Sequence, residues 1–207
     1  NFKEGFFIEI GAFDGITYSN TYQLEKKRNW TGLLVEPSKD NFELCKSARE
    51  GSYVFNYLCV PFNFDKPEII FNDLGLMSYA EILSSSLDLT EHRKGALEHL
   101  RSINKVEKNY MVKTITLDAL LKKIKAPKII NFFSLDVEGS EIQVLKGFNF
   151  NEYTIEYLLI ESRDLNEITN FLNKFSYKLI KEFKEFETTQ QKNLLFQHSS
   201  VSKQKTN

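Results

Sequence analysis

The segment FFIEIGAFDG, residues 6–15, decides the fold of this chain. Its first five residues, Phe6–Ile10, are mostly apolar and have the length of a buried strand. Gly11 and Gly15, four positions apart, then permit a tight turn and a close approach of the backbone to a ligand. The segment therefore predicts a strand that runs directly into a glycine loop.

Strands and helices alternate along most of the remaining chain. Ser19 or Asn20 is suited to cap a first helix that ends near Asn29. Further strands are predicted at Gly32–Val35, Tyr53–Val60, Ile129–Leu135, Ile155–Ile160, Tyr177–Phe183 and Asn193–Phe196, and further helices at Asn41–Arg49, Thr116–Leu121, Glu138–Leu145 and Leu165–Phe175. This order predicts an α/β fold with a doubly wound, mostly parallel sheet of about seven strands. The two adjacent final strands predict an antiparallel hairpin at one edge.

We interpret residues 1–197 as a single domain with an insertion at about 62–113. The insertion breaks the alternation, although Glu68–Phe71 could form a strand and Thr90–Arg101 a helix. Residues 198–207 are polar and without periodicity, so we expect a tail. The chain begins without Met and enters a strand almost at once, which we interpret as one domain of a longer polypeptide.

Composition excludes several classes of protein. A hydrophobic content of 42% and a charged content of 27% are ordinary for a globular domain, and the formal net charge is only −1. No overall field favours a phosphate backbone, so no nucleic-acid partner is expected. No apolar run reaches the roughly 18 residues of a membrane span, so none is expected. Two cysteines are too few for a disulfide framework, which favours a reducing, cytoplasmic location.

Carboxylates stand at the ends of four predicted strands. They are Glu9 with Asp14, then Glu36, then Asp136 with Glu138, and finally Glu161. Open α/β sheets bind ligands outside the carboxyl ends of their strands. One acidic residue at a strand end is commonly only a turn residue, but four such ends on one edge of the sheet predict a binding site.

The glycine loop indicates which cofactor this site binds. Neither the G-x-G-x-x-G dinucleotide fingerprint nor the G-x-x-x-x-G-K-[ST] phosphate loop is present. The actual pattern, E-x-G-x-x-x-G, places Glu9 and Asp14 where a sulfonium or amino group fits better than a phosphate. Glu36 follows Gly15 by about 21 residues, at the position of an acid that accepts hydrogen bonds from ribose hydroxyls. The loop therefore favours S-adenosylmethionine over a nicotinamide cofactor.

The sequence resembles the FkbM-type methyltransferases over roughly residues 6–162. The segments that carry the resemblance, in order, are Phe7–Gly15, Ser19–Thr21 with Leu24 and Glu25, Trp30–Pro37, Thr114–Asp118, and Ser134–Glu141 running into Val144–Gly147. The resemblance implies a class I methyltransferase (Rossmann-like) fold, S-adenosylmethionine as methyl donor, and a hydroxyl oxygen as acceptor, often on a sugar or polyketide. The pair Phe13–Asp14 departs from many members, which leaves the role of Asp14 open.

The resemblance also implies roles for individual residues. The predicted cofactor-binding residues are Glu9, Gly11, Ala12, Asp14, Gly15, Ser19, Asn20, Thr21, Glu36, Pro37, Ser38, Cys59, Val60 and Asp136. Among them, Glu9 and the two glycines would line the methionine end, Ser19–Thr21 would meet its carboxylate, and Cys59 with Val60 would lie near the adenine. Simple helix capping explains Ser19 equally well.

Asp136 and Glu138 are the predicted catalytic residues. By the same resemblance Asp136 would lie beside the transferable methyl group, with Glu138 close to it. Together with Glu161 they could ligate a divalent cation through oxygen atoms. For Glu138 and Glu141 the alternative is that each only favours the first turn of a helix.

The acceptor is the least determined part of the site. A sugar hydroxyl, on a glycan or a glycosylated metabolite, is the expected acceptor, and Phe71, Met77, Tyr79 and Tyr110 of the insertion could contact it or simply pack in a core. His92 and His99 lie two helical turns apart; a solvated face is the favoured interpretation, and a general base in the acceptor site the alternative. The competing functions are a non-catalytic methyltransferase-like module and a nicotinamide-dependent oxidoreductase.

Overall fold

The computed structural model describes residues 4–84, 88–183 and 192–203. A seven-stranded sheet forms its centre, in the order β3-β2-β1-β7-β8-β10-β9. These strands are β1 (Phe6–Ile10), β2 (Thr31–Val35), β3 (Tyr53–Phe55), β7 (Ile129–Leu135), β8 (Thr154–Ser162), β9 (Tyr177–Phe183) and β10 (Lys192–His198). Only β10 runs antiparallel to its neighbours β8 and β9. The predicted doubly wound, mostly parallel sheet with an antiparallel edge is confirmed, and it is a class I methyltransferase fold.

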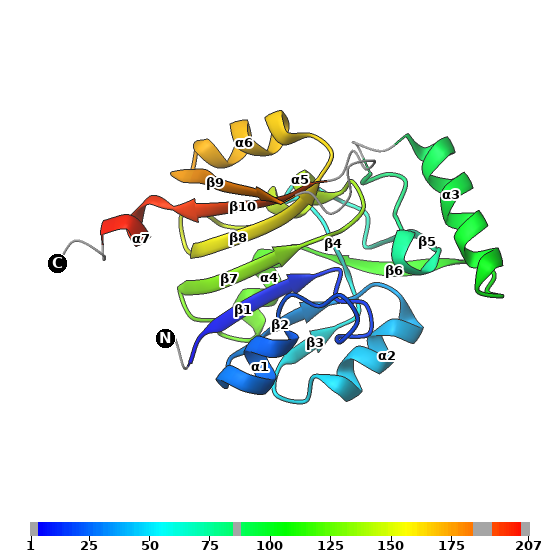
Figure 1. Cartoon of the computed structure of the whole chain (residues 1–207), viewed down its shortest axis with the longest axis horizontal. Coiled ribbons are helices and arrows are strands. Elements are labelled where there is room, and N and C mark those ends of the chain that lie inside the picture. Colours follow the sequence, from blue (N-terminus) through cyan, green and yellow to red (C-terminus); the bar gives the residue numbers. More distant parts are fainter. Residues whose placement is uncertain (1–3, 85–87, 184–191, 204–207) are drawn as a thin grey trace.

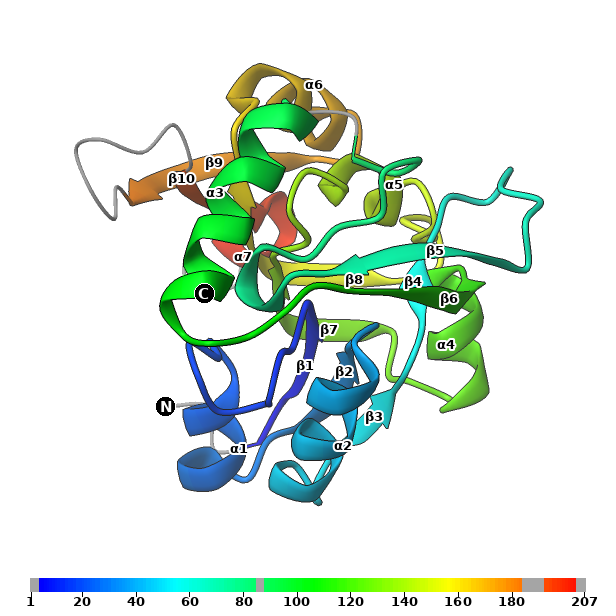
Figure 2. The same ribbon diagram turned by 90° about the vertical axis from the view of Figure 1, so that its right-hand side faces the viewer.

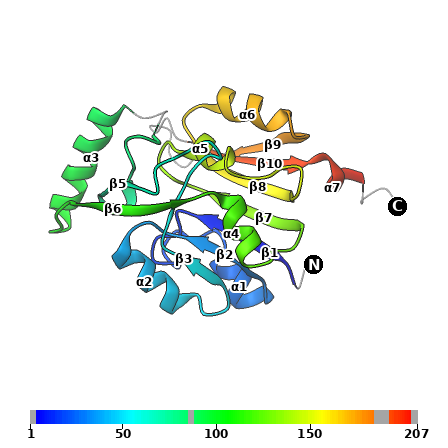
Figure 3. The same cartoon turned by 180° about the vertical axis from the view of Figure 1, so that it is seen from behind.

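Helices cover both faces of this sheet (Figures 1 and 3). α1 (Tyr22–Arg28) and α2 (Lys39–Ala48) lie on one face, and α4 (Leu117–Lys123), α5 (Glu141–Leu145) and α6 (Leu165–Asn173) on the other. Strand β1 is buried throughout because its side chains alternate between the two layers: Ile8 packs with α4 and α5, and Phe7 packs against the α1 and α2 side.

A second, three-stranded sheet lies beyond the carboxyl ends of the parallel strands (Figure 2). It pairs β4 (Leu58–Cys59), β6 (Lys108–Ile115) and β5 (Glu68–Asp73), and the short helix η1 (Gly75–Met77) and α3 (Leu89–Ser102) connect β5 to β6. Most of this unit falls in the segment interpreted as an insertion. Asp73 of β5 links this sheet to the start of α2, because its carboxylate accepts a hydrogen bond from Ser38 Oγ, the α2 N-cap, at 2.8 Å. Within the second sheet it also accepts one from Tyr110 Oη of β6 at 2.6 Å.

The single strand predicted at Tyr53–Val60 is wrong. β3 pairs with β2 in the main sheet, whereas β4 pairs with β6 in the second sheet. The side-chain amide of Asn56, between them, donates hydrogen bonds to the backbone carbonyls of Glu36 and Pro37, both at 2.8 Å. These bonds fix a turn in the chain that a continuous apolar run does not reveal.

Two predicted element boundaries also need correction. The helix expected from Glu138 begins only at Glu141, because Glu138 and Gly139 have φ values of 49° and 88°, which an α-helix cannot accommodate. The polar tail expected from residue 198 begins later: His198 closes β10, and α7 (Ser199–Lys203) follows with Val201 buried. The rest of that expected tail, residues 204–207, lies outside the described residues. Among the described helices, none is long and apolar enough to cross a membrane.

Candidate functional site

A cavity of about 870 Å³ opens at the carboxyl ends of β1, β2, β7 and β8, under the second sheet. Its size lies within the range of small-molecule sites. The predicted site residues that line it are Glu9, Gly11, Ala12, Ser19, Asn20, Glu36, Pro37, Cys59, Asp136, Glu138 and Glu161. Asp14, Gly15, Thr21, Ser38 and Val60 are not among its lining residues. The cavity therefore lies at the sheet edge that sequence reasoning selected.

Glu36, at the end of β2, is one of the carboxyl groups that line the cavity. It is buried, and its two oxygens accept hydrogen bonds from the backbone amides of Phe13 and Ser38, both at 2.8 Å. Burial raises the pKa of Glu36 to about 8 despite these two bonds. Because each carboxyl oxygen has a second lone pair, the side chain can still accept hydrogen bonds from a ligand in the cavity.

Glu9, at the end of β1, has its carboxylate engaged inside the protein. It accepts hydrogen bonds from Ser19 Oγ at 2.8 Å, from the Asn20 amide at 3.0 Å and from Thr21 Oγ1 at 2.5 Å. Burial raises the pKa of Glu9, although these bonds and the charge of Arg49 oppose the rise. These three hydrogen bonds hold the segment before α1 in place.

Arg49 is the residue that sequence reasoning missed in this region. It follows α2, is completely buried, and its guanidinium extends beneath the β1–α1 loop. Its nitrogens donate to Glu25 Oε2 at 2.9 Å, to Gly15 O at 3.0 Å and to Thr21 Oγ1 at 2.9 Å, and one lies 3.4 Å from Glu9 Oε2. A basic residue at a helix end is common on surfaces, so the sequence alone offers no signal of its burial.

Both glycines of the loop have positive φ and almost no room for a side chain. A Cβ on Gly11, at φ 83°, would lie 1.8 Å from the carbonyl oxygen of Asp136. A Cβ on Gly15, at φ 78°, would lie 2.8 Å from Arg49 Cγ. Gly11 therefore lets the β1 and β7 ends come together at the cavity, and Gly15 lets the loop rest on Arg49.

Asp14, Ser38 and Val60, which were also predicted to bind the cofactor, are not among the residues that line the cavity. Asp14 accepts hydrogen bonds from the amides of Ile16 and Thr17, at 2.9 and 2.7 Å, and forms a turn. Burial acts to raise the pKa of Asp14, but its hydrogen bonds, led by the one from the Thr17 hydroxyl at 2.6 Å, lower the pKa overall. Ser38 accepts the Asn41 amide as the N-cap of α2, and Val60 packs in the small core of the second sheet.

Helix α1 has Thr21 as its N-cap residue, in place of the expected Ser19 or Asn20. The hydroxyl of Ser19 nevertheless accepts a hydrogen bond from the amide of Tyr22 at 3.0 Å, as a capping side chain does. The side-chain amide of Asn20 donates to Ser134 Oγ of β7 at 3.0 Å. The polar groups of this segment thus have partners within the protein.

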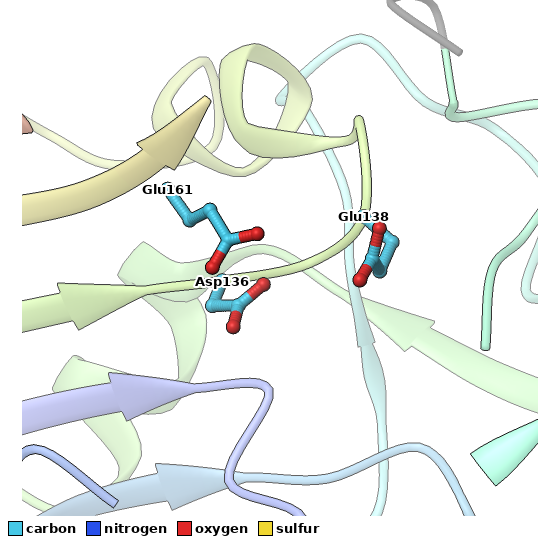
Figure 4. A group of neighbouring side chains, drawn as sticks. All are labelled: Asp136, Glu138 and Glu161. Carbon is cyan, nitrogen blue, oxygen red and sulfur yellow. The ribbon is translucent and has the colours of Figure 1, made fainter. Parts of the chain in front are cut away.

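Asp136, Glu138 and Glu161 gather at the ends of β7 and β8 (Figure 4). One oxygen from each lies within 4.8 Å of the other two, close enough to share a cation. Glu138 is also held by Arg163, with 3.4 Å between Nη2 and Oε2. Beneath them, burial raises the pKa of Glu141 to about 7, although its carboxyl group accepts the Gly139 amide at 2.9 Å.

The expectation of a shared solvated face for His92 and His99 is wrong, because His92 is buried and only His99 is exposed. Nε2 of His92 lies 2.9 Å from the carbonyl oxygen of Met77, and Nδ1 lies 3.9 Å from Glu138 Oε2. Helix α3 packs on η1, and the ring of His92 lies against the ring of Tyr79. Burial lowers the pKa of His92.

Residues 9–179 match the family model of the methyltransferase FkbM domain. This chain belongs to the FkbM methyltransferase domain family. The match includes the end of β1 and all of β2, β7 and β8, and the site carboxylates lie at the ends of these strands. Among curated proteins, none matches this chain.

Solved structures share the fold of this FkbM domain at low sequence identity. Methyltransferase FkbM from Methylobacillus flagellatus KT is 12% identical with a TM-score of 0.56; the match covers 95% of this chain and 44% of that one. The human methyltransferase 10 domain containing protein is 12% identical with a TM-score of 0.51, covering 94% and 71%. TrmK of M. capricolum, bound to S-adenosylhomocysteine, is 10% identical with a TM-score of 0.49, covering 95% and 63%. The chain thus spans less than two thirds of TrmK and of the Methylobacillus protein.

The FkbM domain also has cavity walls that were not predicted. Tyr18 in the β1–α1 loop, Tyr57 before β4 and Leu76 of η1 line the cavity, as do Phe71 and Tyr79, which sequence reasoning had named for the acceptor. Of the other two residues named with them, Met77 packs with the core at α3, and the Tyr110 hydroxyl donates to Asp73. Exposed loop aromatics have no periodic pattern, so their position emerges only from the folded chain.

Proposed function

We propose that this domain is an S-adenosylmethionine-dependent O-methyltransferase whose acceptor is a hydroxyl of a sugar, on a glycan or a glycosylated metabolite. The observation that carries the proposal is that one cavity contains both Glu36, at the ribose position, and the carboxylates Asp136 and Glu138. The residues proposed to bind the cofactor and those proposed to act on the acceptor therefore lie at the same edge of the sheet. Membership of the FkbM family supports methyl transfer over the nicotinamide alternative.

The residues fit such a cofactor. Bound S-adenosylmethionine would supply a methyl group on a positively charged sulfur. In the proposal Glu36 accepts the ribose hydroxyls, Gly11 and Ala12 leave backbone space at the methionine end, and Cys59 with Leu58 forms an apolar wall for the adenine. Val60, Ser38 and Thr21 act indirectly, because they pack or hydrogen-bond behind the cavity.

Methyl transfer to a hydroxyl requires alignment of the oxygen and removal of its proton. A positioned carboxylate can orient the hydroxyl and accept the proton, a contribution of about a hundredfold to ten-thousandfold in rate. Asp136 is the proposed base because it directly follows the central strand β7 and its side chain is exposed to the cavity. Glu138 is the neighbouring carboxylate, oriented by Arg163.

Asp136, Glu138 and Glu161 have a second possible role as ligands of a divalent cation that lowers the pKa of the acceptor hydroxyl. The ion pair of Glu138 with Arg163 competes with that role. We also propose a cytoplasmic location, supported by two buried free cysteines among the described residues.

The deciding experiment incubates the protein with methyl-labelled S-adenosylmethionine and a panel of mono- and oligosaccharides. We expect the label on a saccharide as an ether, which resists mild base. Cofactor binding without transfer to any saccharide would support the non-catalytic module or another acceptor. No binding of S-adenosylmethionine, together with micromolar binding of NADH in a fluorescence titration, would restore the oxidoreductase alternative.

A further inference from the structure

The ionisable side chains that line the cavity are acidic. Asp136, Glu138 and Glu161 lie at the proposed acceptor end, and Glu9 and Glu36 lie at the cofactor side. Among the described residues, no Lys, Arg or His lines this cavity. The nearby Arg163 is already paired with Glu138. A phosphate or carboxylate on the acceptor would therefore meet like charge at the cavity wall, and juxtaposed like charges are strongly unfavourable in a partly desolvated site.

An aromatic ring stands at the mouth of the same cavity. Tyr18, in the β1–α1 loop, is 82% exposed although it lines the cavity. Leu76 of η1, 41% exposed, lines it from the second sheet. Tyr18 and Leu76 thus form an apolar rim at the opening of the cavity, and the carboxylates line its interior.

The loop that carries Tyr18 is fixed on both sides. Before it, Asp14 accepts the amides of Ile16 and Thr17; after it, Ser19 Oγ donates to Glu9 at 2.8 Å. Tyr18 itself has φ 56°, a conformation that a bulky residue rarely adopts and that surrounding contacts must maintain. The ring is thus presented by a constrained backbone, so less conformational entropy is lost when a ligand contacts it.

We propose that Tyr18 is the acceptor platform of this enzyme, and that it stacks on the apolar face of an uncharged sugar ring whose hydroxyl reaches Asp136. This inference rests on the proposed function and specifies its acceptor. A sugar ring combines a face of C–H groups with a rim of hydroxyl donors; the first suits an aromatic ring and the second suits carboxylate acceptors. The acidic lining restricts the acceptor to sugars without phosphate or carboxylate near the reacting hydroxyl.

Saturation-transfer NMR on the protein saturated with S-adenosylhomocysteine tests the platform. The probes are the neutral methyl glycosides of glucose, galactose, mannose, fucose and rhamnose, with glucose 6-phosphate and glucuronate as charged counterparts. We expect at least one neutral glycoside to bind through its C–H face and the charged counterparts to bind at least about tenfold more weakly. Tyr18→Ala should weaken that binding, and raise KM in the transfer assay, by about fivefold to tenfold, whereas Tyr18→Phe should retain it.

Tyr53→Ala is the matched control, since Tyr53 is a half-exposed tyrosine of β3 that is not among the cavity residues. Equal behaviour of Tyr18→Ala and Tyr53→Ala, or equal binding of charged and neutral sugars, would overturn the inference while leaving sugar methylation intact. If S-adenosylhomocysteine binds in calorimetry but no sugar binds or is methylated, the proposed acceptor class fails, and the platform fails with it.

Discussion

At the scale of single residues, Asp136 is the side chain that we expect to act on the acceptor. Asp136→Asn is nearly isosteric, and the side chain is exposed at a strand end, so the fold and most of the cofactor affinity should survive. If the carboxylate orients the hydroxyl and accepts its proton, turnover should fall by at least about a hundredfold. Single-turnover transfer from labelled cofactor measures the effect.

Asp65→Asn is a suitable control, because Asp65 is exposed and is not among the cavity residues. A chelator added to the wild type separates the two roles of Asp136. Activity that is lost and then restored by magnesium or manganese supports a cation, and unchanged activity supports the direct base. Near-normal turnover of Asp136→Asn would remove this residue from the chemistry and shift attention to Glu138 and the adjacent His92.

Glu36 provides a separate prediction about the cofactor. Glu36→Ala removes the acceptor of two ribose hydroxyls. Because burial raises the pKa of Glu36 to about 8, we take each bond as a neutral one worth about 0.5 to 1.5 kcal/mol, so the affinity should fall by roughly tenfold to a hundredfold. The Glu36→Ala substitution also leaves the backbone amides of Phe13 and Ser38 without their hydrogen-bond acceptor. Glu36→Gln, which keeps a carbonyl oxygen, should therefore lose less stability. Calorimetric titration of S-adenosylmethionine, with exposed Glu43→Ala as control, would contradict the ribose role if the affinity does not change.

Sequence reasoning located the carboxylates but not the directions in which they point. Glu36 and Asp136 could be predicted at the cavity because a parallel sheet brings its strand ends to one edge. Glu9 also lines the cavity, but its carboxylate hydrogen-bonds to Thr21 and to Arg49, which follows α2. Side-chain contacts between residues distant in sequence have no local signature.

At the scale of elements, the β1–α1 loop depends on a residue that follows α2. Arg49 bonds to Glu25 of α1 and to the carbonyl of Gly15, and it lies over the ring of Phe7 in β1. One buried cation thus joins a strand, a loop and a helix. We therefore expect its loss to affect the whole cofactor side of the sheet.

Arg49→Met leaves Glu9 and Glu25 buried without their cation. Removing one partner of a buried ion pair typically costs about 3 to 5 kcal/mol of unfolding free energy. We expect a loss of this size in urea denaturation, together with weaker cofactor binding by the loop. Arg28→Met, at an exposed position of α1, should change stability by less than about 0.5 kcal/mol. A loss below about 1 kcal/mol for Arg49→Met would show that the network is not structurally important.

Elements were predictable where the apolar pattern was regular. The buried strand Ile129–Leu135 and the helix capped by Thr116, whose hydroxyl accepts the Ala119 amide, are confirmed as β7 and α4. The apolar pattern gave a wrong prediction at Tyr53–Val60, because one apolar run contributes strands to two sheets. It was also wrong at Glu138, because the positive φ of this residue places it before the start of the helix. Backbone conformations that leave the ordinary regions depend on tertiary contacts.

At the scale of the whole molecule, the second sheet converts an open sheet edge into a cavity. Its arrangement was not predictable, because β4, β5 and β6 are short or partly exposed and pair across long stretches of sequence. The main sheet was predictable, since its strands are mostly buried and alternate with helices. The same burial that forms the cavity places several carboxyl groups away from water.

These buried groups predict how stability varies with pH. Burial raises the pKa of Glu36 to about 8 and of Glu141 to about 7, from 4.5 for an unperturbed Glu. From pH 4.5 up to about 8 for Glu36, and up to about 7 for Glu141, the folded chain binds more protons at these groups than the unfolded chain. The free energy of unfolding therefore falls as pH rises through this window. The histidines His92 and His198 have pKa values lowered from 6.5 by burial, so below pH 6.5 the unfolded chain binds more protons at these two groups and they oppose this trend.

Urea denaturation between pH 6.5 and 9 should therefore show decreasing stability, with a slope of at most about 1.4 kcal/mol per pH unit from each Glu. Glu141→Gln keeps the shape of the side chain and removes its titration, so this variant should have a flatter profile up to about pH 7. Glu43→Gln, at an exposed position of α2, should leave the slope unchanged. If wild type and Glu141→Gln have the same slope, or stability rises towards pH 9, then these carboxyl groups are ionised in the folded protein and the pH argument fails.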